Sequence, residues 1–127
     1  MSFLDKIKLI NKKVYILGGL GLIGKKVVEN TLSVGAEVIV LDIKQGEIQS
    51  NVKYEKFDCS KLKTLEKNFN RIIKKLGCPD VFINCSYPRT KDWTQCSFNK
   101  ITLKRMTKNV EIHMNSYAWA AKIVAEK

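Results

Sequence analysis

Residues 14–24 have the sequence VYILGGLGLIG, in which an apolar run leads into a glycine-rich turn. The turn contains Gly18, Gly19, Gly21 and Gly24, which are four of the seven glycines in the chain. A turn with few side chains lets backbone N–H groups approach a pyrophosphate, and the start of the following helix carries partial positive charge. The stretch therefore predicts the phosphate-binding turn of a dinucleotide-binding βαβ unit.

Strand and helix patterns alternate along the rest of the chain. Gly35 and Gly77 each follow a helical pattern, where a left-handed residue often ends a helix, and Ser60 is expected to cap the second helix. The predicted elements are strand 14–17, helix 22–34, strand 37–42, strand 52–57, a helix between Ser60 and Gly77, strand 81–84 and helix 101–127. This order predicts an α/β fold of the doubly wound Rossmann type, truncated to about four parallel strands in the order 3-2-1-4 with flanking helices.

The spacing of apolar residues predicts which faces of two helices are buried. In the first helix the expected buried residues are Ile23, Val27, Val28 and Leu32. In the last helix the expected stripe is Met106, Val110, His113 or Met114, Tyr117, Ala121 and Val124.

Length and composition predict one dinucleotide-binding domain over residues 1–127, with 45% hydrophobic residues available for a core. No apolar run approaches the roughly 20 residues of a membrane span. The first six residues lack a signal-peptide pattern, and residues 1–12 have the pattern of a short polar lead-in. We therefore expect a cytoplasmic protein without a membrane partner.

The net charge of +11 comes mainly from lysines spread along the chain, and arginine occurs only at positions 71, 89 and 105. Without a basic block or interleaved aromatic residues, nucleic acid is not expected as the main partner. An anionic substrate or cofactor also suits this charge. The cysteines are Cys59, Cys78, Cys85 and Cys96. They form no Cys-x-x-Cys pair and have a single histidine to help them, so no metal site is expected.

Asp42 lies 18 residues after Gly24, at the end of the second predicted strand. A carboxylate there accepts hydrogen bonds from the adenine-ribose hydroxyls and repels a 2′-phosphate, which favours NAD over NADP. Lys44 weakens that preference, since a nearby cation could hold the phosphate. The plainer alternative is a tight structural turn at Gly18–Gly24 and a solvated strand end at Asp42.

The glycine turn resembles the Gly-x-x-Gly-x-x-Gly signature of short-chain dehydrogenases/reductases, with Leu17 where a threonine is usual. Asp58 and Cys59 resemble the pair that contacts the adenine ring in that family. Residues 80–86, DVFINCS, are similar to the strand that ends in Asn-Asn-Ala-Gly, with Asn84 matching and Cys85, Ser86 and Tyr87 departing. Asn115 lies where the family has a helix asparagine that holds a water of the proton relay.

The resemblance spans essentially the whole chain and implies an NAD(H)-dependent oxidoreductase that transfers hydride to or from a carbonyl or alcohol carbon. It implies Asn115 as a catalytic residue. The implied cofactor-binding residues are Gly18, Gly21, Leu22, Ile23, Gly24, Asp42, Asp58, Cys59, Asn84 and Cys85. The loop 86–89 is also similar to members linked to bacterial surface-sugar and flagellin modification, which implies a sugar-like small-molecule substrate.

Several of these residues have plainer alternative roles. Asp58 could cap the following helix, and Asn84 could satisfy the backbone of a turn. Asn115 could be a polar residue on the exposed side of the last helix. His113 is expected to be a packed helix residue and not a catalyst.

The family also implies a catalytic serine and a helical Tyr-x-x-x-Lys pair. The sequence contains this spacing once, at Tyr87 and Lys91, but Pro88 disfavours a helix there. The chain is therefore expected to be either a fragment or a naturally short product, inactive in hydride transfer by itself. The fourth strand is expected at an open sheet edge, which predicts self-association. A non-catalytic nucleotide-binding module and a basic nucleic-acid-binding domain are the rival predictions.

Overall fold

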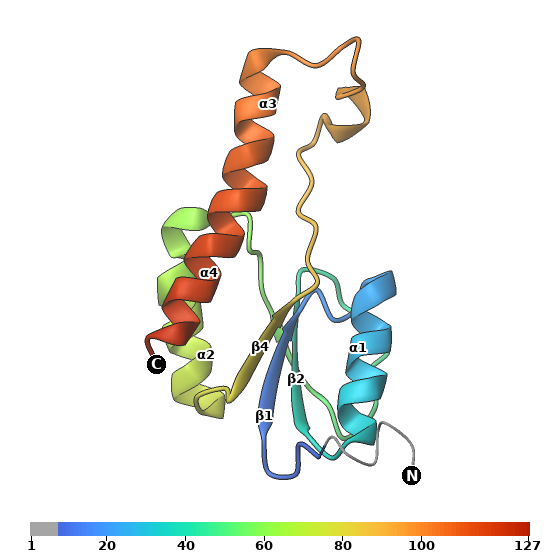
Figure 1. The fold of residues 1–127 in the computed structure, drawn as a ribbon, viewed down its shortest axis with the longest axis vertical. Coiled ribbons are helices and arrows are strands. Elements are labelled where there is room, and N and C mark those ends of the chain that lie inside the picture. The colour runs from blue at the N-terminus through green and yellow to red at the C-terminus, as the bar shows by residue number, and fades with distance from the viewer. Residues whose placement is uncertain (1–7) are drawn as a thin grey trace.

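The computed structural model describes residues 8–127. The first part of the predicted lead-in, residues 1–7, lies outside the described residues. Figure 1 shows a parallel sheet with α1 (Leu22–Ser33) on one face, and α2 (Leu65–Leu76) and α4 (Ser116–Ala125) on the other. The chain therefore forms three layers, helix on sheet on helix.

The sheet consists of β1 (Lys13–Leu17), β2 (Glu37–Asp42), β3 (Lys53–Lys56) and β4 (Val81–Asn84). The strands are parallel and lie in the order β3-β2-β1-β4, which confirms the predicted doubly wound topology. Their carboxyl ends therefore meet at one edge of the sheet. Leu17, the last residue of β1, pairs with Leu41 on one side and with Asn84 on the other.

Alternate residues of the central strands feed two separate hydrophobic clusters, as the two-residue period of a strand requires. Tyr15 and Leu17 of β1 pack with Phe69 of α2 and Ile123 of α4 on one face. On the other face, Val14, Ile16, Val38 and Val40 pack against Val28 of α1. Because both faces are covered, the central strands can be apolar throughout.

Helix α1 buries the predicted face at Val28 and half-buries it at Val27 and Leu32, but Ile23 departs from the prediction. Gly24, Val28 and Thr31 are buried, whereas Ile23 is 70% exposed, so the prediction for Ile23 was wrong. The absence of a side chain at Gly24 lets the helix lie directly against the preceding turn. Position 24 therefore faces the protein and position 23 faces outward.

Helix α2 follows a 3-10 turn (Leu62–Thr64), and the predicted cap at Ser60 was wrong. The hydroxyl of Ser60 instead donates to Oδ1 of Asp58 at 2.6 Å. The end of the helix agrees with the prediction, because Gly77 has a φ of 88° and its N–H donates to the carbonyl of Ile73.

The last part of the chain is a continuous helical rod made of α3 (Leu103–Val110), a π-helical turn (Glu111–Asn115) and α4. Its buried residues are Ile112, Ser116, Ala120 and Ile123. The predicted stripe was wrong at Met106, Val110 and Ala121, which are exposed, while Tyr117 and Val124 are half-buried. Of the two alternatives between them, His113 is half-buried and Met114 is exposed. Two physical reasons explain the difference. The π turn inserts a residue and rotates the helix face, and α3 extends beyond the sheet (Figure 1).

Candidate functional site

The glycine turn connects β1 to α1 at the carboxyl edge of the sheet. Gly18 has a φ of 78°, and its N–H donates to the carbonyl of Leu41 at 2.7 Å. A Cβ atom at Gly18 would lie 2.7 Å from the backbone nitrogen of Ser86. The turn is thus wedged between the ends of β2 and β4, and position 18 requires glycine for both conformation and space.

Helix α1 begins immediately behind this turn at Leu22, and Gly21 is its N-cap residue. A Cβ atom at Gly24 would lie 2.0 Å from the carbonyl oxygen of Gly18, so the first helical turn and the glycine turn are in direct contact. No side chain caps the helix, and its first turn has no acidic residue. Within residues 8–127, the amides of Leu22, Ile23 and Gly24 have no hydrogen-bond acceptor. Unpaired amides at a helix start fit the phosphates of a dinucleotide.

The carboxylate of Asp42 is buried beside this turn and is 7% exposed. Its Oδ2 atom accepts a hydrogen bond from the N–H of Leu20 at 2.9 Å, and its Oδ1 atom accepts one from the N–H of Lys44 at 3.0 Å. The alternative of a solvated strand end at Asp42 was therefore wrong. Each oxygen keeps capacity for another donor, such as a ribose hydroxyl.

Asp58 and Cys59 follow β3 at the same edge. Oδ1 of Asp58 accepts hydrogen bonds from the N–H of Ser60 at 3.0 Å and from its hydroxyl at 2.6 Å, so Asp58 stabilises a turn and does not cap α2. Cys59 is buried, and its Sγ atom lies 3.4 Å from Oγ of Ser86. Burial raises the pKa of the Cys59 thiol, which keeps it in the neutral form.

Asn84 and Cys85 end β4 beside the glycine turn. Oδ1 of Asn84 accepts hydrogen bonds from the N–H of Ser86 at 2.9 Å and from its hydroxyl at 2.6 Å. Asn84 thus makes the turn-stabilising contact that was its plainer alternative. The N–H of Cys85 donates to the carbonyl of Leu17 at 2.7 Å. A role of either residue in holding a cofactor stays a prediction.

Asn115 does not join the other predicted site residues. Its side chain is exposed and lines a surface hollow with Leu62, Lys63, Ala118, Trp119 and Lys122, between α4 and the turn that precedes α2. This placement agrees with its plainer alternative, a polar residue on the exposed side of the helix.

His113 and Tyr117 occupy the helix face that contacts the segment after β4. Nε2 of His113 lies 2.6 Å from the carbonyl oxygen of Pro88, and the hydroxyl of Tyr117 donates to the carbonyl of Ser86 at 2.7 Å. Ser86 links Cys59, Asn84 and Tyr117, a role that was not predicted from the sequence. The available signal was its position, two residues after Asn84, where a short polar side chain can close a turn.

Tyr87 and Lys91 lie in the non-helical segment after β4, which confirms that they are not a helical Tyr-x-x-x-Lys pair. The described residues contain no cluster of three His, Cys, Asp or Glu side chains able to hold a metal ion. Among residues 8–127, every helix is too short or too polar to span a bilayer.

No family model matches the chain. It is 23% identical to post-translational flagellin modification protein A of Campylobacter coli, over 87% of this chain and 48% of that protein. It is also 26% identical to a short-chain dehydrogenase of Leptospira borgpetersenii solved with bound NAD⁺, with a TM-score of 0.75 over 98% of this chain and 48% of the other. The chain resembles the N-terminal half of a short-chain dehydrogenase/reductase.

The aldohexose dehydrogenase of Thermoplasma acidophilum shares the fold, with a TM-score of 0.76 at 20% identity. That match covers 98% of this chain and 46% of the archaeal enzyme. The chain thus spans about half the length of the relatives it matches.

Proposed function

We propose that this chain binds NAD at the carboxyl edge of its sheet. The observation that supports this most strongly is the combination of an uncapped α1 with a buried carboxylate hydrogen-bonded to the glycine turn. The pyrophosphate would accept hydrogen bonds from the free amides of Leu22, Ile23 and Gly24. Gly18 and Gly21 would let it approach the backbone.

Asp42 is proposed to select NAD over NADP. Its two oxygens are fixed by the amides of Leu20 and Lys44, so the carboxylate cannot turn away from the ribose. The 2′-phosphate of NADP would lie close to the buried carboxylate of Asp42, and the two negative charges would repel each other. Asp58 and Cys59 are proposed to line the adenine pocket, because they follow β3, next to β2 in the sheet.

We further propose that the chain supplies the cofactor-binding part of an oxidoreductase that acts on a small carbonyl or alcohol compound. Asn84 ends β4 and Cys85 follows it, on the other side of the glycine turn from Asp42, and both would lie under the nicotinamide half of NAD. Bound NAD would supply the hydride acceptor. The names of the flagellin modification protein and of the aldohexose dehydrogenase support a sugar-like substrate.

A second candidate is a nucleotide-binding module without catalysis. The observation in its favour is that the one Tyr-x-x-x-Lys spacing of residues 8–127 lies in a non-helical segment. Turnover above background in an NADH oxidation assay, on a panel of sugar aldehydes and ketones, would exclude the module. Because the chain by itself is expected to be inactive under either candidate, a chain without turnover is assigned by the reading frame after Lys127. A serine and a helical Tyr-x-x-x-Lys pair encoded there favour the oxidoreductase, and their absence favours the module.

Calorimetric titration with NAD and with NADP tests the proposed cofactor site. We expect NAD to bind at least about tenfold more tightly than NADP, and D42N to reduce this ratio by about tenfold through loss of the negative charge. E29Q on the outer face of α1 is the matched control, because it removes a surface carboxylate whose one ion pair among the described residues is with Lys26. An NAD to NADP ratio that D42N leaves unchanged removes the role assigned to Asp42, and no binding of either nucleotide overturns the proposed function.

We also propose that the chain self-associates. Within residues 8–127, β4 pairs only with β1, so its other edge carries unpaired backbone groups beside the exposed Val81. Such an edge is a template for pairing with another strand. Light scattering is expected to show dimers or larger species that V81K weakens, and a monodisperse monomer would contradict this proposal.

A further inference from the structure

In the part of the chain that the structure describes, Arg89 differs from Arg71 and Arg105 in having no acidic partner. Arg71 pairs with Glu55 at 3.2 Å, and Arg105 pairs with Asp92 at 2.7 Å. Within residues 8–127, no carboxylate lies in ion-pairing distance of Arg89. The side chain of Arg89 is exposed and can therefore be reached by a ligand. Its guanidinium carbon instead lies 4.6 Å from the ring centre of Trp93.

Trp93 and Tyr87 together form an aromatic shelf under this guanidinium. The two rings are arranged edge to face with their centres 6.4 Å apart, and Arg89 lies 6.0 Å from the centre of Tyr87. An arginine stacked on aromatic rings keeps its N–H groups free for a planar or tetrahedral anion. The shelf therefore orients a charge without neutralising it.

The segment that carries Arg89 is fixed from the helical rod. The hydroxyl of Tyr117 holds the carbonyl of Ser86, and the His113 ring contacts the carbonyl of Pro88. The same His113 ring stacks on Tyr87 with the ring centres 4.6 Å apart. These contacts hold the backbone directly before Arg89 and the ring of Tyr87 on which it stacks. Binding of a ligand by Arg89 therefore costs little conformational entropy in this segment.

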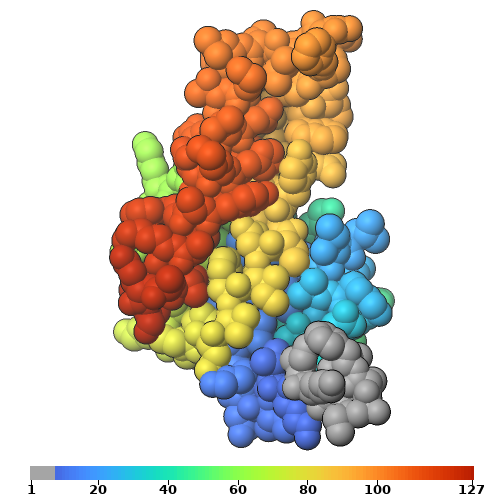
Figure 2. Space-filling model, viewed as in Figure 1, coloured from blue at the N-terminus to red at the C-terminus, as the bar shows by residue number. Residues whose placement is uncertain are grey.

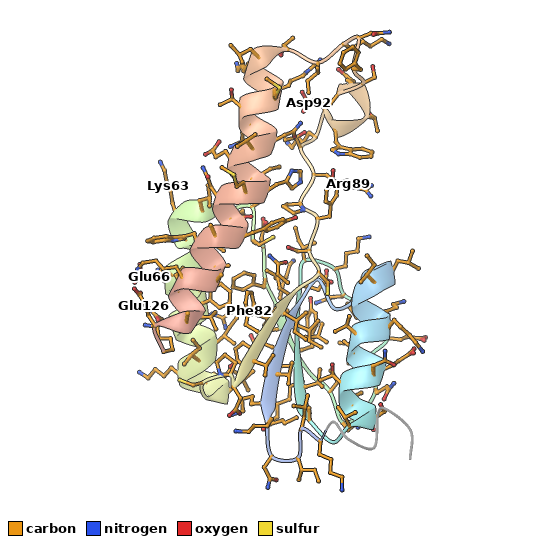
Figure 3. All side chains as sticks on the ribbon, in the orientation of Figure 1. Lys63, Glu66, Phe82, Arg89, Asp92 and Glu126 are labelled. Atoms are coloured by element: carbon orange, nitrogen blue, oxygen red, sulfur yellow. The ribbon has the colours of Figure 1, made fainter. Side chains whose placement is uncertain are left out.

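The position of Arg89 relative to the glycine turn indicates what it binds. In the strand order β3-β2-β1-β4, Asp42 at the end of β2 and the segment after β4 lie on opposite sides of the turn at the end of β1. Figure 3 shows Arg89 pointing to the side of the segment where α1 lies, above the start of that helix. In Figure 2 the surface is concave between the start of α1 and the yellow-orange residues after β4.

We propose that Arg89, stacked on Tyr87 and Trp93, is a specificity-determining residue that binds an anionic group, a phosphate or a carboxylate, of the substrate. This inference rests on the proposed function, which places the nicotinamide half of NAD on the β4 side. In that arrangement the adenosine half lies toward Asp42, and the pyrophosphate accepts hydrogen bonds from the amides of α1. No part of NAD then pairs with Arg89, so its positive charge is available to the substrate that reacts beside the nicotinamide.

The test is a calorimetric titration of the chain, with and without saturating NAD, using glucose 1-phosphate, glucuronate and glucose as probes. We expect at least one anionic probe to bind about tenfold more tightly than glucose, as a charge-assisted hydrogen bond allows. R89Q should remove that preference and leave NAD affinity unchanged. K91Q is the control, because it removes an equal charge two residues away and off the shelf.

Three outcomes would overturn the proposal. The first is equal binding of the charged and neutral sugars, or no binding of any probe, by a chain that binds NAD. The second is an equal loss for K91Q and R89Q, which indicates attraction by net charge alone. The third is weaker NAD binding by R89Q, which assigns Arg89 to the cofactor. Failure of the chain to bind NAD is a separate result, and it contradicts the proposed function itself.

Discussion

The carboxylate of Asp42 accepts a hydrogen bond from the backbone N–H of Leu20 at 2.9 Å, across the gap between the end of β2 and the glycine turn after β1. The residue expected to select the cofactor therefore also fixes the loop expected to bind its phosphates. A second bond, from the N–H of Lys44, orients the other oxygen. Changes at Asp42 should consequently alter stability as well as selectivity.

Replacing Asp42 with alanine is expected to destabilise the chain by about 1–3 kcal/mol, because the amides of Leu20 and Lys44 lose their buried acceptor. D42N keeps one acceptor oxygen and should be destabilised less. Urea unfolding followed by circular dichroism measures both effects. Equal stability of D42A and the wild type would mean that the hydrogen bond to Leu20 does not hold the turn.

Replacing Gly24 with alanine tests the contact between α1 and the glycine turn. In a free helix this change would stabilise by about 1 kcal/mol. Here the new Cβ atom would lie 2.0 Å from the carbonyl oxygen of Gly18, so the helix and the turn must separate. We expect a net loss of about 1–3 kcal/mol and a fall in NAD affinity of at least about tenfold.

G46A is the matched control for that change. A Cβ atom at Gly46 would make only an ordinary contact with Leu20, at 3.5 Å. Its stability and NAD affinity should stay close to those of the wild type. If the two alanine variants behave alike, the close packing of α1 on the turn is not what maintains the site.

β1, β2 and β4 were predictable because each is short, mainly apolar and bounded by residues that end strands. The bounds of β2 and β4 were predicted to the residue, and the glycine turn follows β1 as expected. The burial of Asp42 was not predictable, since the amide that binds it belongs to Leu20, 22 residues earlier. A sequence pattern shows that a carboxylate ends a strand but does not show which backbone group faces it.

The errors in the helices have a local cause. The apolar pattern in α1 placed Ile23 inward. It did not take into account that Gly24, which has no side chain, lets the helix pack closely on the glycine turn. In the last helix the π turn rotates the faces on either side, so a single 3.6-residue period fits only one half. Within that turn His113 contacts the segment after β4, whereas Asn115 is exposed.

Glu55 on β3 is expected to make stability depend on pH. Burial alone raises its pKa, but hydrogen bonds from Lys75 and Arg71 outweigh burial and hold the pKa below its usual value. A carboxylate with a lowered pKa stabilises the folded state above its unfolded pKa of about 4.3, and that stabilisation is lost as the pH falls through the folded value. E55Q should cost about 1.5–3 kcal/mol at neutral pH.

Urea unfolding of E55Q and the wild type at several pH values measures this dependence. The difference in free energy of unfolding should shrink as the pH falls below about 4. E29Q, which breaks an exposed pair with Lys26, should cost about 0.5 kcal/mol or less at any pH. A constant difference between E55Q and the wild type would show that the ionised carboxylate is not the source of the stability.

The four free cysteines should react with a thiol reagent in an order set by exposure and pKa. Cys78 is exposed, whereas Cys59 is buried and Cys85 is half-buried, and burial raises the pKa of both of these thiols. Because the thiolate is the reactive form, we expect Cys78 to be modified first and Cys59 last, with rates at least about tenfold apart. Mass spectrometry after timed labelling with iodoacetamide gives each rate.

The same labelling also tests the proposed cofactor site at Cys85. Saturating NAD should slow the modification of Cys85, which ends β4 beside the glycine turn, and leave the rate at Cys78 unchanged. In urea the protein should show similar rates at all four cysteines, since burial is lost. If Cys59 reacts as fast as Cys78 in the folded chain, Cys59 is not buried against Ser86 at the end of β3. If NAD protects Cys78 as strongly as Cys85, the nucleotide tightens the whole fold and does not cover the end of β4.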